Sequence, residues 1–142
     1  AYFIRMRDQV RREVGYYVPI SGAAYTTHLG ATGLLGTEAN ILPKTYRRFL
    51  DALNAENHDD LAVAYAEIQR FLTYVQRWSP GPTRWIKMAM KVLKLPGGEG
   101  GVREPYRIPP AAELEQFADG LVKLGVPEIT EQARAAGLLA TA

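Results

Sequence analysis

The sequence of 142 residues contains no cysteine, which excludes a disulfide scaffold and any metal site built on thiolates. No apolar run is long enough to span a bilayer, and the first residues lack the apolar core of a signal peptide. An excess of one charge is also missing, because 17 Lys and Arg residues stand against 15 Asp and Glu residues. We therefore expect a cytoplasmic protein that binds no nucleic acid and no membrane.

Histidine is scarce, and the sequence offers no other ligand set for a metal ion. His28 and His58 are the only histidines and share no ligand spacing, whereas a zinc site needs three or four ligands. The glycine-rich stretch at residues 96–101 lacks the Lys-Ser/Thr pair of a phosphate-binding loop. Neither feature predicts a cofactor. Hydrophobic residues make up 47% of the chain, which is enough to form a core.

The first third of the chain alternates between helical and extended patterns. Apolar and arginine residues interleave over residues 3–12 as in an amphipathic helix. Residues 17–20 are a short apolar run that predicts a strand, although Pro19 removes one backbone donor. A short helix over residues 23–29 and a second small strand over residues 32–36 follow. This alternation predicts parallel β/α units.

The remaining sequence predicts helices. Pro43 suits the first position of one helix, and Asn57 or His58 precedes the next. The apolar stripe of that second helix comprises Leu61, Tyr65, Ile68, Leu72 and Val75. Residues 79–82, Ser-Pro-Gly-Pro, should end it. Further helices are expected over residues 85–93, 110–124 and 127–137, with an extended segment over residues 103–109.

Two parallel strands are too few for a stable sheet. Each would leave unsatisfied backbone groups along its open edge. We therefore expect further strands, supplied either by sequence upstream of this chain or by another chain.

Several motifs follow one another in the order found in one enzyme family. Ser21 and Gly22 follow the first predicted strand, and Gly-Ala-Thr-Gly at residues 30–33 leads into the second. The series continues with Ala-Asn-Ile-Leu-Pro at residues 39–43, a lysine-rich helix at residues 86–95 and Arg-Glu-Pro at residues 103–105. Together these motifs resemble the C-terminal half of the dihydrodipicolinate synthase and N-acetylneuraminate lyase family of class I aldolases, over nearly the whole chain.

The resemblance implies an α/β fold, a (β/α)8 TIM barrel with a C-terminal helical extension. Only the last two β/α units and the extension would be present. Residues 1–43 would carry strands seven and eight, and residues 44–142 would form the extension. A full barrel takes roughly 250 residues. The family's Schiff-base lysine lies on strand six, just upstream of Ala1, so we expect no catalytic residue in this chain and interpret its abrupt start as a truncation.

The implied activity is that of a pyruvate-dependent lyase. A lysine amine attacks the ketone of a 2-oxo acid to form an imine, which acts as an electron sink, so no cofactor is needed. Carbon–carbon bond formation or cleavage with an aldehyde, or loss of water, can then proceed next to the carbonyl. The family also implies a homo-oligomer, either a dimer or a tetramer.

The resemblance also places a substrate pocket at the C-terminal ends of the strands. The residues expected to line it are Ser21, Gly22, Leu35, Gly36 and Thr37. Gly22 would let the backbone approach the oxo acid closely. Sialic-acid lyases carry acidic residues after the serine-glycine, but Ala23 and Ala24 stand here, which disfavours a sugar acid and favours a hydratase-aldolase with an aromatic substrate. Glu38 is placed to reach the mouth of the barrel.

A second function class remains open. The chain would then be a non-catalytic helical interaction module or an inactive fragment, binding another chain through its apolar face. A lysine upstream in the native gene favours the lyase. Stable monomeric folding of residues 1–142 alone favours the interaction module.

Overall fold

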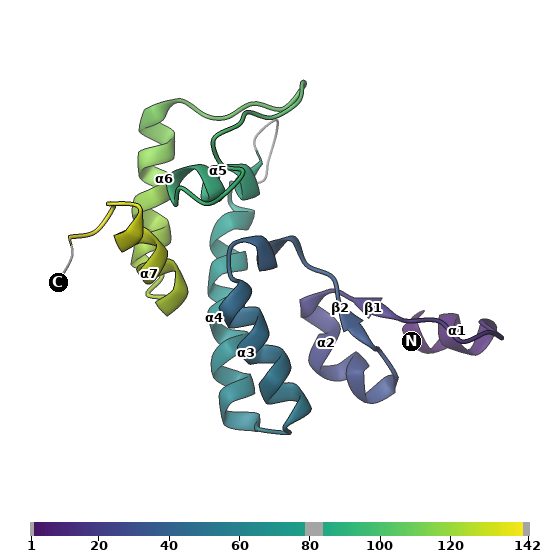
Figure 1. Cartoon of the computed structure of the whole chain (residues 1–142). Helices are drawn as coiled ribbons and strands as arrows, with labels where there is room; N and C mark the ends of the chain where they lie inside the picture. Colours follow the sequence, from purple (N-terminus) through teal and green to yellow (C-terminus); the bar gives the residue numbers. More distant parts are fainter. Residues whose placement is uncertain (1, 79–83, 141–142) are drawn as a thin grey trace. The chain divides into compact units, whose positions relative to one another are not determined.

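The computed structural model describes residues 2–78 and 84–140, and the chain divides into two compact units (Figure 1). Unit 1 comprises Ala1–Thr37 and unit 2 comprises Glu38–Ala142. This division falls a few residues before residue 43, where the resemblance ends the barrel strands. The helix break predicted at residues 79–82 lies outside the described residues.

Unit 1 is built from alternating helices and strands, as its sequence predicts. Its elements are α1 (Tyr2–Gln9), β1 (Tyr17–Val18), α2 (Ile20–Thr26), the 3-10 helix η1 (Thr27–Leu29) and β2 (Gly33–Leu34). The two strands pair in parallel, with Tyr17 opposite Gly33 and Val18 opposite Leu34. The predicted parallel β/α arrangement is therefore confirmed at this level.

Both strands are shorter than predicted. The first ends at Val18 because Pro19 has no N–H for a ladder and instead caps α2 with extended dihedral angles (φ −70°, ψ 157°). Ile20 then begins α2, so Ser21 and Gly22 lie in the first turn of this helix, just beyond the end of β1.

Gly33 is required by the residue opposite it on the neighbouring strand. A Cβ atom at Gly33 would lie 2.6 Å from Cε1 of the Tyr17 ring, far inside van der Waals contact. The Tyr17 ring therefore lies across Gly33, and a larger residue at this position would have to displace it. The sequence alone did not reveal this contact.

Unit 1 leaves much apolar surface in water. Tyr2, Tyr17, Tyr25 and Leu35 are between 66% and 81% exposed. Within residues 2–78 and 84–140 no third strand joins the two-stranded sheet. The expectation that further strands complete this sheet stays a prediction, and the exposed side chains agree with it.

Unit 2 is helical, as predicted. After the 3-10 helix η2 (Thr37–Asn40), its helices are α3 (Pro43–Asn54), α4 (His58–Gln76), α5 (Trp85–Val92), α6 (Ala111–Lys123) and α7 (Pro127–Ala135). Pro43 and Pro127 occupy first-turn positions, and the Asn57 side chain caps α4 by accepting from the Asp60 amide at 3.2 Å.

The core of unit 2 lies between these helices. Phe49 of α3, Phe71 of α4 and Phe117 of α6 are fully buried. Helices α3 and α4 form an antiparallel hairpin, visible in Figure 1, and Arg48 donates across it to the buried Glu67 at 2.6 Å. The buried stripe of α4 is Ala64, Ile68, Phe71 and Val75, with the buried Glu67 beside it. Leu61, Tyr65 and Leu72 are only half-buried. The buried face of α4 is therefore rotated about the helix axis relative to the predicted apolar stripe.

Replacing Gly120 with alanine is expected to destabilise unit 2 by about 2 kcal/mol, because it overpacks the contact between α4 and α6. A Cβ at Gly120 would lie 2.2 Å from the Tyr74 hydroxyl, which donates to the Phe117 carbonyl at 2.8 Å. Thermal unfolding followed by circular dichroism measures the effect. Gly100→Ala is the control, because no atom lies within 4 Å of its added Cβ.

Candidate substrate site at the strand ends

The five residues expected to line a pocket all lie in unit 1, in two segments. Ser21 and Gly22 occupy the first turn of α2, directly after β1, whereas Leu35, Gly36 and Thr37 directly follow β2. Because β1 and β2 run in parallel, both segments leave the sheet at the same edge. The structure therefore brings the two segments to one end of the strands, where α/β folds bind their ligands.

Gly22 has no structural need to be glycine. Its N–H donates to the Pro19 carbonyl at 3.1 Å, and its own carbonyl accepts from the Thr26 hydroxyl at 2.7 Å. A Cβ added at Gly22 would lie 3.8 Å from the nearest atom, Cγ2 of Thr26, which is an ordinary contact. Glycine in a helix costs about 1 kcal/mol relative to alanine. The space beside Gly22 is thus kept open at some cost in stability.

The residues after β2 stay close to the strand pair. The Leu35 amide donates to the Val18 carbonyl at 3.0 Å, extending the ladder, while the Leu35 side chain is 74% exposed. Gly36 is half-buried and Thr37 begins η2. The segment presents one hydroxyl, that of Thr37, and no charged side chain.

Glu38 is directed to α3. Its Oε2 accepts from the Tyr46 hydroxyl at 3.1 Å. Burial, with the nearby negative charge of Glu38, raises the pKa of Tyr46 well above its usual value. This hydrogen bond holds one carboxylate oxygen of Glu38 at α3, and the expectation that Glu38 reaches a pocket mouth stays a prediction.

The raised pKa of Tyr46 predicts a loss of stability at alkaline pH. The unfolded chain releases the phenol proton above about pH 10, whereas the folded chain keeps it, so the unfolding free energy falls by up to about 1.4 kcal/mol per pH unit. A free phenol loses its proton over roughly pH 9 to pH 11. Urea titrations at several pH values across this range should show that Tyr46→Phe flattens the decline. Tyr25→Phe, at a tyrosine 66% exposed, should leave the decline unchanged.

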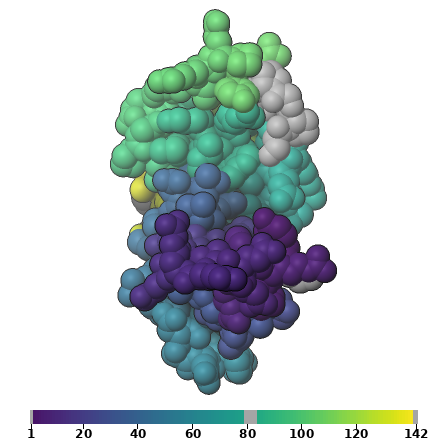
Figure 2. Space-filling model, turned by 90° about the vertical axis from the view of Figure 1, so that its right-hand side faces the viewer, coloured from purple at the N-terminus to yellow at the C-terminus, as the bar shows by residue number. Residues whose placement is uncertain are grey.

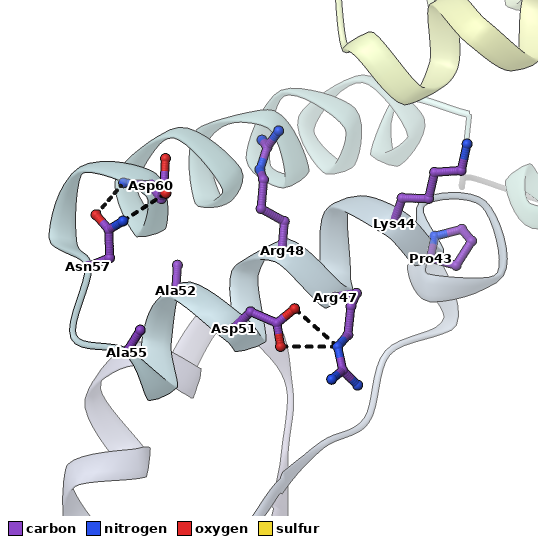
Figure 3. A pocket seen from close by; sticks show the side chains of 9 residues that line it. All are labelled: Pro43, Lys44, Arg47, Arg48, Asp51, Ala52, Ala55, Asn57 and Asp60. Atoms are coloured by element: carbon purple, nitrogen blue, oxygen red, sulfur yellow. Dashed lines mark hydrogen bonds and ion pairs between the residues drawn. The ribbon is translucent and has the colours of Figure 1, made fainter.

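A hollow lies over the hairpin of α3 and α4 in unit 2 (Figure 3). Its volume is about 680 Å³, and Lys44, Arg47 and Arg48 are its basic lining residues. Each of these cations is already in an ion pair, with Glu131 at 2.6 Å, Asp51 at 3.0 Å and Glu67 at 2.6 Å respectively. Since its cations already have carboxylate partners, this hollow shows no feature that points to a particular ligand.

In residues 2–78 and 84–140, no three His, Asp or Glu side chains gather closely enough to hold a metal ion. His28 and His58 are both exposed, in η1 and at the start of α4. No helix in the same ranges combines the length and apolar character needed to cross a membrane.

Comparison with protein-family models, curated proteins and solved structures found no match. The features of this chain that bear on function are therefore its residues at the strand ends and the order of its motifs.

Proposed function

We propose that this chain is the C-terminal part of a Schiff-base aldolase or lyase that acts on pyruvate or a related 2-oxo acid, similar to dihydrodipicolinate synthase. The remaining strands of a TIM barrel would come from sequence outside this chain. The observation that carries the proposal is the parallel β1–α2–β2 unit, because the five motif residues follow the C-terminal ends of its strands. That edge is where barrel enzymes hold their substrates.

The proposed chemistry assigns binding to this chain and bond-making to a lysine outside it. The lysine forms an imine with the oxo acid, and the imine then accepts electrons from the adjacent carbon. Ser21 and Thr37 place a hydroxyl on each of the two segments, and a hydroxyl is a group that hydrogen-bonds a substrate carboxylate. The open space at Gly22 allows the substrate to approach the backbone.

The surroundings of Gly22 favour an apolar second substrate. Ala23 is fully buried, Ala24 is exposed, and neither can hydrogen-bond a polyhydroxylated sugar. An aldehyde with an aromatic group, as used by a hydratase-aldolase, fits better. A homo-oligomer, dimer or tetramer, belongs to the same proposal.

One observation favours the alternative of a non-catalytic interaction module. Tyr2, Tyr17, Tyr25 and Leu35 expose an apolar surface that any partner could cover. Further barrel strands and a partner protein would both cover this surface. Only a test of the chemistry therefore distinguishes the lyase from the interaction module.

The test is reduction of the native protein with borohydride in the presence of pyruvate, followed by intact mass and peptide mapping. We expect a gain of one pyruvate less one water plus two hydrogens, on a lysine outside residues 1–142. Borohydride without pyruvate is the control. Absence of an adduct, or an adduct on one of the lysines of this chain, would overturn the lyase proposal.

A further inference from the structure

Positive charge is concentrated in one part of unit 2. Residues 84–107 contain two acidic residues, Glu99 and Glu104, against six basic ones, so their net charge is +4 while the whole chain carries +2. The basic residues are Arg84, Lys87, Lys91, Lys94, Arg103 and Arg107. The expectation that the chain binds no nucleic acid was based on its balanced total charge. That total conceals the local excess of positive charge in this segment.

The segment is held against α5 at several points, and the basic residues are carried by α5 and by this segment packed on it. The guanidinium of Arg84 lies 3.4 Å from the centroid of the Tyr106 ring. Lys87 donates to the Gly97 carbonyl at 2.8 Å, and the amide of Leu95 donates to the Met90 carbonyl at 2.9 Å. Between α5 and α6 the chain projects as a loop (Figure 1), and its green atoms protrude at the upper end of the face in Figure 2. We call α5 with residues 93–107 the basic α5 surface.

Four of these cations have no counter-charge. Lys91, Lys94, Arg103 and Arg107 are exposed, and none forms an ion pair within residues 2–78 and 84–140. The basic residues of the α3 groove, by contrast, are all paired. Lys91 and Lys94 lie at the C-terminal end of α5, where the helix dipole favours positive charge, and this explains their presence there. The dipole does not account for the two arginines, which lie outside any helix. The segment predicted to be extended turns here, because the Tyr106 amide donates to the Arg103 carbonyl at 2.9 Å.

The chemistry of the surface favours a phosphate-bearing strand with unstacked bases. Arginine binds phosphate oxygens in a bidentate manner. Tyr106 is 39% exposed, and Arg84 covers one face of its ring, so a base would stack on the other face. No other large apolar side chain between residues 84 and 107 is as exposed, so the surface offers a membrane little apolar area. An acidic protein segment would use the charges but would not need the ring.

We propose that the basic α5 surface binds single-stranded nucleic acid, with phosphates on its four unpaired cations and a base on Tyr106. This proposal is independent of the lyase proposal, because it involves no residue of the strand ends. Non-specific binding by so few contacts is weak, with a Kd on the order of 10⁻⁵ M. Four phosphate contacts give a slope of about −3 for the logarithm of the affinity against that of the salt concentration.

Fluorescence anisotropy with a labelled oligouridylate of about a dozen nucleotides tests this proposal. Replacing all four unpaired cations with glutamine should lower the affinity of the chain by at least about tenfold and bring the salt slope close to zero. Tyr106→Leu should lower it by about fivefold or more. The matched control replaces four exposed cations elsewhere, Arg11, Arg12, Lys123 and Arg134, with glutamine and should retain most of the affinity.

Three results would overturn the proposal. One is no binding at low salt by a chain whose circular dichroism shows it to be folded. Another is an equal loss of affinity in the control variant, which would indicate a response to net charge alone. The third is displacement of the oligonucleotide by polyglutamate at equal charge concentration, with no effect of Tyr106→Leu, which would assign the surface to an acidic protein segment.

Discussion

Replacing Glu128 with alanine should lower the unfolding free energy of unit 2 by about 3 kcal/mol. The Glu128 side chain, on α7, is buried and accepts from the backbone amides of Lys44 and Thr45 at 3.0 and 2.8 Å. Its carboxylate also accepts from the Thr45 hydroxyl at 2.7 Å. These groups lie in the first turn of α3, where amides have no partner within the helix. Removing the carboxylate leaves two backbone amides and one hydroxyl without their hydrogen-bond acceptor.

Urea denaturation followed by circular dichroism measures this effect, and Glu131→Ala is its matched control. Glu131 lies on the same helix, carries the same charge and pairs with Lys44 at 2.6 Å, but both side chains are largely exposed. An exposed pair contributes about 0.5 kcal/mol or less. Equal losses in the two variants would mean that water replaces Glu128 at the start of α3.

Gly22→Ala should abolish most of the proposed lyase activity without unfolding the protein. An added Cβ has ordinary van der Waals room within unit 1, and alanine favours a helix, so stability should rise by about 0.5 kcal/mol. The same methyl group would occupy the space proposed for the oxo acid. We expect kcat/KM in the native protein to fall by about 100-fold, as for a substrate displaced by roughly 1 Å.

The control for Gly22→Ala is His28→Gln, at an exposed residue of the neighbouring 3-10 helix η1. It should leave both stability and activity close to their original values. A Gly22→Ala protein that is more stable and fully active would remove Gly22 from the site. A protein that is less stable would show that the glycine has a folding role, against the geometry described above.

The helical unit was predictable because its signals are local. Pro43 and Pro127 favour the first turn of a helix through their fixed φ angle, and Asn57 caps through its own side chain. Each of these effects acts within four residues. The strand ends were less predictable, since Pro19 could either interrupt a strand or begin a helix, and the sequence pattern did not distinguish them.

The candidate site was predictable only as two segments of sequence. Ser21, Gly22 and residues 35–37 were chosen by resemblance to a family, and the parallel pairing of β1 and β2 is what brings both segments to one edge. That Gly22 has free space while Gly33 lies under a tyrosine ring cannot be deduced from two glycines in a sequence, because it depends on which side chain crosses each of them.

By itself, the sequence determined the alternation of helices and strands in unit 1, the helices of unit 2 and the local excess of positive charge near α5. These follow from periodicity, turn residues and composition, which act over short stretches. Only the tertiary structure decided two side-chain contacts. Glu128 accepts a hydrogen bond from the first turn of α3, 83 residues away, and Glu38 accepts one from the Tyr46 hydroxyl. A carboxylate looks the same in the sequence whether it is solvated or buried. Its partner is settled only when packing removes water and leaves one set of donors within reach.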